Sequence, residues 1–146
     1  MKKYLVYIFL GTFLLNCSGG GDDGGETLEP QPQKPTSASL NFPNQNSECT
    51  EGTNITATNS TVLFKWNAGA NTNSYDLVLK NLESGVSTTH TATTNEKSIE
   101  LLRATPYSWY IVSKSNEVSD TATSATWKFY NAGAGFVNYA PFPATA

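Results

Sequence analysis

The chain has 146 residues, of which only one is histidine, two are cysteine and one is methionine. So few of these residues exclude most metal sites built from histidine and cysteine, because a zinc site needs three or four ligands. Charged residues make up 14% and the net charge is −3, so no basic surface for nucleic acid is expected. The sequence also lacks a phosphate loop, a nucleophile elbow and a calcium loop. We therefore expect no enzyme activity, no cofactor and no metal.

Apolar residues are sufficient for one folded domain. They make up 38% of the chain and include seven Phe, seven Tyr and three Trp. Enough apolar area exists to bury a core, which excludes a disordered chain. The length allows one domain with short additions but not two domains. We expect that domain to be monomeric.

The first residues are typical of an export signal. Lys2 and Lys3 precede an apolar run, Tyr4 to Leu15. The run is shorter than the about twenty residues that a helix needs to cross a bilayer. A basic start followed by a short apolar stretch predicts a secretory signal peptide.

The run ends in Leu14-Leu15-Asn16-Cys17, which resembles the lipobox of bacterial lipoproteins. The resemblance implies that residues 1–16 are removed as a signal peptide and that Cys17 carries lipid. Acyl chains contribute about 0.8 kcal/mol per buried methylene, so the lipid would anchor the protein to a membrane. The alternative is an ordinary cleaved signal with an incidental cysteine.

Residues 17–36 are interpreted as a lipidated flexible linker, because glycines and acidic residues are followed by prolines. This composition resembles the tethers of Bacteroidota lipoproteins, and Ser18 fits the sorting of lipoproteins to the outer membrane. We therefore expect an outer-membrane lipoprotein of the cell envelope. Whether it faces the periplasm or the cell surface stays open.

Residues 37–131 show no helical period. Short runs of alternating apolar and polar residues recur between clusters of Asn, Gly, Thr and Ser, which indicates half-buried strands. Seven strands are expected, near Ala38–Asn41, Thr61–Trp66, Ser74–Asn81, Val86–Thr91, Ser98–Leu101, Tyr107–Ser115 and Thr123–Tyr130. This number fits a single all-β, antiparallel, immunoglobulin-like sandwich. For the second, third, fifth, sixth and seventh of these strands, the alternation also predicts which side chains point inward: Val62, Phe64, Trp66, Tyr75, Leu77, Leu79, Ile99, Leu101, Tyr107, Trp109, Ile111, Ala125, Trp127 and Phe129.

Three segments together resemble fibronectin type III domains. They are Thr61–Trp66, which ends in Trp66, Ser74–Leu79, which contains Tyr75, and Leu101–Tyr107. The last resembles the family's Leu-x-Pro-Gly-Thr-x-Tyr corner, in which the tyrosine hydroxyl bonds back to the backbone. The resemblance implies structural roles for Trp66, Tyr75, Leu101 and Tyr107. Arg103 and Ala104 depart from the family's Pro and Gly.

Residues 132–146 form an aromatic C-terminal segment. Phe136, Val137, Tyr139 and Phe142 fall within seven positions of it. Exposed apolar side chains are unfavourable, so we expect the segment to fold back on the sandwich, as a partial strand or as a cover for an edge. The alternative is a docking peptide for a partner.

A candidate ligand face follows from the alternation, which points Tyr110, Val112, Lys128 and Tyr130 outward together. Tyrosines side by side can stack on sugar rings or anchor a protein. The alternative is a cross-strand pair that only stabilises the sheet.

Three single residues complete the candidates. His90 is expected to be an exposed residue of an edge strand. Cys49 is expected to be an inert, partly packed thiol, with a disulfide-linked dimer as the alternative. Thr121 follows Asp120 in a three-residue sequence that resembles the Bacteroidota acceptor for O-glycosylation.

These observations favour a non-catalytic lipoprotein whose single domain is a binding or adhesion module on a lipid anchor. Two alternatives stay open. One is a carbohydrate-binding accessory lipoprotein of a glycan-uptake system, and the other is a structural spacer within an envelope complex. The partner, protein or glycan, is not identified by the sequence, because function depends on sites rather than on the fold.

Overall fold

The computed structural model describes Glu29 and residues 31–134, which contain nine strands and no helix. The strands are β1 (Ser39–Phe42), β2 (Ser47–Thr50), β3 (Asn59–Asn67), β4 (Ser74–Asn81), β5 (Ser87–Ala92), β6 (Glu96–Leu102), β7 (Thr105–Lys114), β8 (Thr121–Thr123) and β9 (Trp127–Asn131). The described part of the chain thus holds no helix that could span a membrane. The expected signal peptide, Cys17, most of the linker and residues 135–146 lie outside the described residues.

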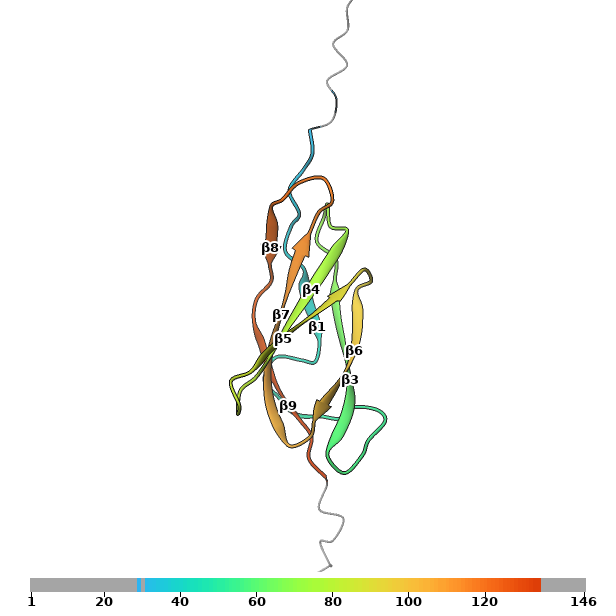
Figure 1. The fold of residues 1–146 in the computed structure, drawn as a ribbon, viewed down its shortest axis with the longest axis vertical. Helices are drawn as coiled ribbons and strands as arrows, with labels where there is room; N and C mark the ends of the chain where they lie inside the picture. Colours follow the sequence, from blue (N-terminus) through green and yellow to red (C-terminus); the bar gives the residue numbers. More distant parts are fainter. Residues whose placement is uncertain (1–28, 30, 135–146) are drawn as a thin grey trace, which may run out of the picture. The chain divides into compact units, whose positions relative to one another are not determined.

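The strands form two sheets (Figure 1). The first has the order β1-β3-β6, and the second has the order β2-β9-β7-β4-β5, with β8 paired to β7. Every pair is antiparallel except β2 with β9. The two inner faces share one hydrophobic core, in which Phe64 of the first sheet meets Trp109 of the second with ring centroids 5.0 Å apart. The expected all-β sandwich of immunoglobulin and fibronectin type III type is therefore confirmed.

Seven of the nine strands lie near the seven expected ones, and twelve of the fourteen side chains predicted to point inward belong to the buried core. The alternation succeeds because period two separates a buried from a solvated face wherever a strand lies on the core. β2 was not predicted, and its pairing with β9 is parallel.

The expected strand Thr123–Tyr130 is wrong as one element. The hydroxyl of Ser124 accepts a 2.9 Å hydrogen bond from the backbone N–H of Ile111, and the N–H of Ser124 donates to the Ile111 carbonyl. The Ser124 side chain thus takes the place of a backbone acceptor. The row of hydrogen bonds along β7 is interrupted there, and two short strands, β8 and β9, form in place of one long strand. As a result, Ala125 is exposed, contrary to the prediction, while Trp127 packs half-buried against the core.

The connection from β6 to β7 carries the tyrosine corner. The hydroxyl of Tyr107 accepts a 3.1 Å hydrogen bond from the backbone N–H of Leu102. Ala104 adopts a φ of 54° at the position where the family pattern has glycine. Thr105 helps to close the turn, since its hydroxyl donates to the Arg103 carbonyl over 2.9 Å. The corner therefore forms although Arg103 and Ala104 replace Pro and Gly.

The end of the expected linker contacts the sandwich. The backbone N–H of Thr36 donates to the Ala70 carbonyl over 3.0 Å, and the Thr36 hydroxyl accepts from the Ala70 N–H over 2.7 Å. Gly69 allows this approach, because a Cβ there would lie 2.0 Å from the Thr36 carbonyl oxygen. Pro35 is buried, and Lys34 forms a 2.8 Å ion pair with Asp120. The part of the chain that is bonded to the domain thus begins a few residues before Ser37, within the expected linker.

Candidate functional site

The structure separates the two tyrosines of the expected ligand face. Tyr130 lies opposite Pro106 in the β7–β9 ladder, whereas Tyr110 is four residues further along β7 and lies opposite Val78 of β4. Four residues of strand correspond to about 13 Å. Lys128, which is exposed, lies between them. Tyr110 and Tyr130 are therefore not side by side, and they do not form one stacking surface for a sugar ring.

Cys49 lies in β2 and is exposed, so the expectation of a partly packed thiol is wrong. β2 is an edge strand of the second sheet, so it has a neighbouring strand on one side only. Cys49 borders a hollow of about 450 Å³ that Tyr130 also lines. No other cysteine occurs among residues 29 and 31–134.

Thr121 begins β8 and is exposed. The neighbouring Asp120 carboxylate accepts a hydrogen bond from the Lys34 ammonium, and this bond and charge raise the pKa of Lys34. The threonine hydroxyl is accessible, but its glycosylation stays a prediction.

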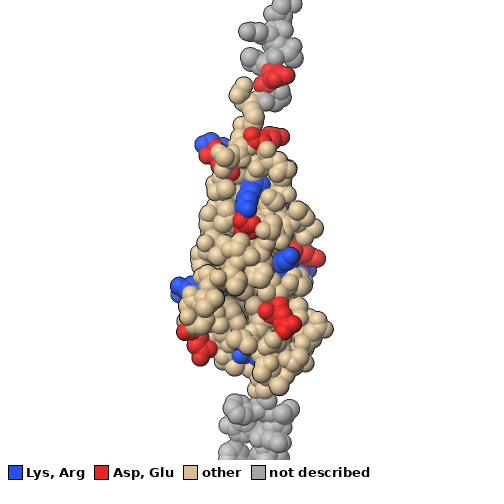
Figure 2. All heavy atoms as spheres, viewed as in Figure 1, with Lys and Arg blue, Asp and Glu red and all other residues tan. Residues whose placement is uncertain are grey.

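Charges are dispersed on the surface. Figure 2 shows Lys and Arg mixed with Asp and Glu over the face in view, without a patch of one sign. The described residues contain no group of three or more His, Cys, Asp or Glu side chains arranged to hold a metal.

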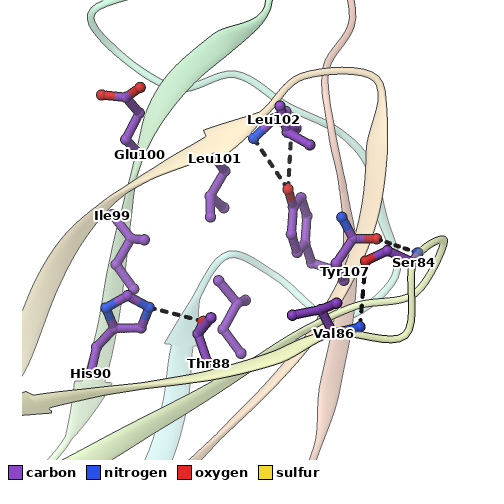
Figure 3. A pocket seen from close by; sticks show the side chains of 11 residues that line it. Ser84, Val86, Thr88, His90, Ile99, Glu100, Leu101, Leu102 and Tyr107 are labelled. Carbon is purple, nitrogen blue, oxygen red and sulfur yellow. Dashed lines mark hydrogen bonds between the residues drawn. The ribbon is translucent and has the colours of Figure 1, made fainter.

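An apolar pocket of about 390 Å³ opens between β5, an edge of the second sheet, and β6, an edge of the first. We call it the β5–β6 pocket. Figure 3 shows Val86, Thr88 and His90 across the pocket from Ile99 and Leu101. The remaining lining residues are Leu79, Asn81, Ser84, Glu100, Leu102 and Tyr107.

The pocket exists because β5 carries small or polar residues at its inward positions. Thr88 lies opposite Leu79 and His90 lies opposite Leu77, and directly opposed residues of an antiparallel pair share a face. Thr88 and His90 therefore point toward the core side, where large aliphatic residues would have filled the gap between the sheets. The neighbouring core residues Leu79, Ile99 and Leu101 are left as an apolar floor.

His90 is half-buried at the wall of the pocket rather than exposed as expected. Its Nε2 atom lies 3.0 Å from the Thr88 hydroxyl. Burial lowers the pKa of His90, and the positive charge of Lys97 lowers it further. The ring is therefore neutral at pH 7, which suits an apolar wall.

The rim of the pocket is also apolar. Val86 is 61% exposed and Leu102 is 52% exposed. The volume falls within the usual range of ligand sites, which are concave and mostly apolar with a few polar groups. The pocket is equipped to bind an apolar group. The pocket was not predicted from the sequence. The available signal was that Thr88 and His90, rather than large aliphatic residues, occupy alternating positions of the strand expected at residues 86–91.

No protein-family model and no curated protein matches the chain. Among solved structures, it is similar to an Fn3-like protein from Clostridium thermocellum, with 22% identity, a TM-score of 0.45, and coverage of 70% of this chain and 95% of that one. It is also similar to a protein described as a myokine structure, with 10% identity, a TM-score of 0.42, and coverage of 69% and 98%. The assignment to a fibronectin type III-like fold rests on the strand order and the tyrosine corner, not on these scores.

Proposed function

We propose that this chain is a non-catalytic binding module of the bacterial cell envelope, anchored by lipid on Cys17, and that its β5–β6 pocket receives apolar side chains of a protein partner. The observation that carries the proposal is the open apolar pocket between two edge strands, flanked by exposed Val86 and Leu102. Exposed apolar groups around a concavity mark binding sites more often than isolated ones do.

The form of the partner follows from β5. As an edge strand paired only with β4, it presents one row of backbone N–H and C=O groups away from that strand. An extended peptide can add to such an edge by backbone hydrogen bonds and place alternate side chains in a neighbouring pocket. An extended segment with alternating apolar side chains therefore fits this site best.

The envelope location is supported by the basic residues, the short apolar run and Cys17 at the N-terminus. It is tested by the mass of the protein purified from membranes. We expect a mature chain that begins at Cys17 and carries acyl chains, and a Cys17→Ser variant that is released from the membrane fraction. An unmodified Cys17 in the membrane-purified protein would reject the anchor.

The binding function is tested with the dye 8-anilinonaphthalene-1-sulfonate on the full chain. Val86→Asp and Leu102→Asp should each weaken dye binding by about tenfold, because each places a charge at the apolar rim. The matched control is Ile55→Asp, which adds the same charge at a residue that is 53% exposed and does not line the pocket. Dye binding equal in all three variants would reject the pocket as the binding site.

A further inference from the structure

A lysine lies on the inward side of β6, in the row of residues that forms the floor of the β5–β6 pocket. Ile99 and Leu101 of this row belong to the core, and Lys97 continues the row at the start of the strand. Lys97 lies opposite Phe64, which is fully buried, and is itself half-buried. It therefore places a positive charge beside the apolar pocket rather than on the outer face of the sheet.

The Lys97 ammonium reaches the open edge of β5, where it donates to the Thr91 carbonyl over 3.2 Å. The Val86 carbonyl accepts from the Asn81 N–H of β4 over 2.9 Å, and successive residues of an antiparallel strand direct their backbone groups to opposite sides. The odd-numbered residues of β5, from Ser87 to Thr91, therefore direct theirs away from β4. Lys97 thus holds its charge at the place where an added strand would lie.

Lys97 has no acidic partner within the described part of the chain, where the ion pairs are formed by other lysines. Glu100 lines the pocket, but it accepts a hydrogen bond from the Asn59 amide, and Figure 3 shows its carboxylate directed away from the pocket. An ammonium has three donors, and the Thr91 carbonyl uses one of them. Two donors of Lys97 are left for an anion.

We propose that the partner segment carries an acidic residue beside the apolar residue that fills the β5–β6 pocket, and that Lys97 binds its carboxylate. Lys97 is two residues along β6 from Ile99, which corresponds to about 7 Å. Residues two apart in an extended segment have the same spacing and point to the same face. The acidic residue is therefore expected two positions from the apolar one. This assignment rests on the proposed function and adds the charge that the partner must carry.

Two dyes that differ in one charged group test the role of Lys97. 8-Anilinonaphthalene-1-sulfonate is an anion, whereas N-phenyl-1-naphthylamine has the same rings without the sulfonate. In the full chain, Lys97→Gln should weaken binding of the anionic dye about fivefold and leave the neutral dye unchanged. The matched control is Lys65→Gln, which removes the same charge at an exposed residue of β3 that pairs with Glu96 over 3.7 Å, and it should affect neither dye.

Peptides blocked at both ends test whether the carboxylate belongs to a protein segment. In Glu-Thr-Val-Thr-Val-Thr-Glu the Val and Glu side chains share one face, and a glutamate at each end allows either strand direction. By calorimetry, this peptide should bind the full chain about fivefold more tightly than the same peptide with Gln at both ends, and Lys97→Gln should remove the difference.

Three results would overturn the assignment. Equal weakening of both dyes in Lys97→Gln would mean that the lysine does not act through its charge. Tighter binding of both peptides to Lys97→Gln would mean that Lys97 protects the edge of β5 against strand pairing. Binding of decanoate that depends on Lys97, with no difference between the two peptides, would mean that the anion belongs to a small amphiphile and not to a protein segment.

The neutral dye separates this assignment from the proposed function. If Val86→Asp weakens binding of the neutral dye while Lys97→Gln changes neither dye, the pocket binds apolar groups and the role of Lys97 fails. If neither dye depends on Val86, the proposed function fails and the role of Lys97 fails with it.

Discussion

The buried hydroxyl of Ser60 in β3 donates a 3.0 Å hydrogen bond to the side-chain oxygen of Asn131 in β9. The two strands belong to different sheets, so this is a polar bond across the sandwich. The amide of Asn131 also donates to the Leu102 carbonyl over 2.9 Å. One fully buried side chain therefore joins the second sheet to two strands of the first.

Replacement of Asn131 by alanine should lower the free energy of unfolding by about 2–3 kcal/mol, because it leaves the Ser60 hydroxyl and the Leu102 carbonyl without this partner. Urea unfolding measures the change. The matched control is Asn67→Ala, whose amide makes an exposed 3.2 Å bond to Ser39 and whose loss should cost less than about 0.5 kcal/mol. Equal effects of the two substitutions would show that the cross-sheet bond contributes nothing special.

Replacement of Ala104 by glycine should stabilise the domain by about 0.5–1 kcal/mol. A φ of 54° is strained for alanine and free for glycine, and this gain exceeds the entropy that glycine adds to the unfolded chain. The control, Ala68→Gly, changes an exposed alanine that is not among the residues of positive φ and should destabilise. Urea unfolding of both variants compares them, and a loss of stability in Ala104→Gly would contradict the prediction.

Stability should fall as the pH rises above about 10. Burial raises the pKa of Tyr107, although its hydrogen bonds to Leu102 and Thr105 oppose the change, and burial also raises the pKa of Tyr75. The unfolded chain loses the phenolic protons at a pH near the ordinary value of 10.0, before the folded chain does, so unfolding becomes more favourable there.

Tyr107→Phe should remove part of this alkaline loss, and it should cost about 1 kcal/mol at neutral pH, since the Leu102 N–H loses its acceptor. Urea unfolding at pH 7 and pH 10.5 separates the two effects. A variant whose stability falls between these pH values as steeply as that of the parent chain would contradict the assignment to Tyr107.

His90 should titrate below its ordinary pKa of 6.5, because burial and Lys97 both disfavour its charged form. The chain has one histidine, so a single imidazole NMR signal reports the midpoint. The unfolded chain takes up this proton first as the pH falls below 6.5, so the domain should lose stability over that interval. His90→Gln should lessen the loss, and Lys97→Gln should move the midpoint upward; a midpoint at or above 6.5 would reject both causes.

The strands on the core were predictable because their apolar residues alternate without interruption, as in Val62, Phe64 and Trp66. β2 was not, since Ser47–Thr50 carries no apolar alternation. Side-chain and loop contacts position it instead: the Gln45 amide oxygen accepts from the Lys128 N–H over 2.6 Å, and the Asn46 N–H donates to the Lys128 carbonyl over 2.7 Å. Such contacts across 83 residues leave no periodic signal in the sequence.

The candidate site was less predictable than the fold. The alternation predicted that both tyrosines point outward, but their separation depends on the register of β9 against β7, which alternation alone does not fix. The β5–β6 pocket depends on the gap between two sheet edges. β5 and β6 are consecutive in the chain but belong to different sheets, so their spacing is a property of the packed sandwich rather than of either segment.

The described chain enters the sandwich at one end and leaves it at the other (Figure 1). Its first strand, β1, is bonded along β3, and its last, β9, is bonded along β7. A pull between the two ends would run along these strands and load several backbone hydrogen bonds of each pair together, in shear, rather than opening them one at a time. Two strand pairs, β1 with β3 and β9 with β7, would therefore have to give way along their whole length before such a pull could extend the described chain.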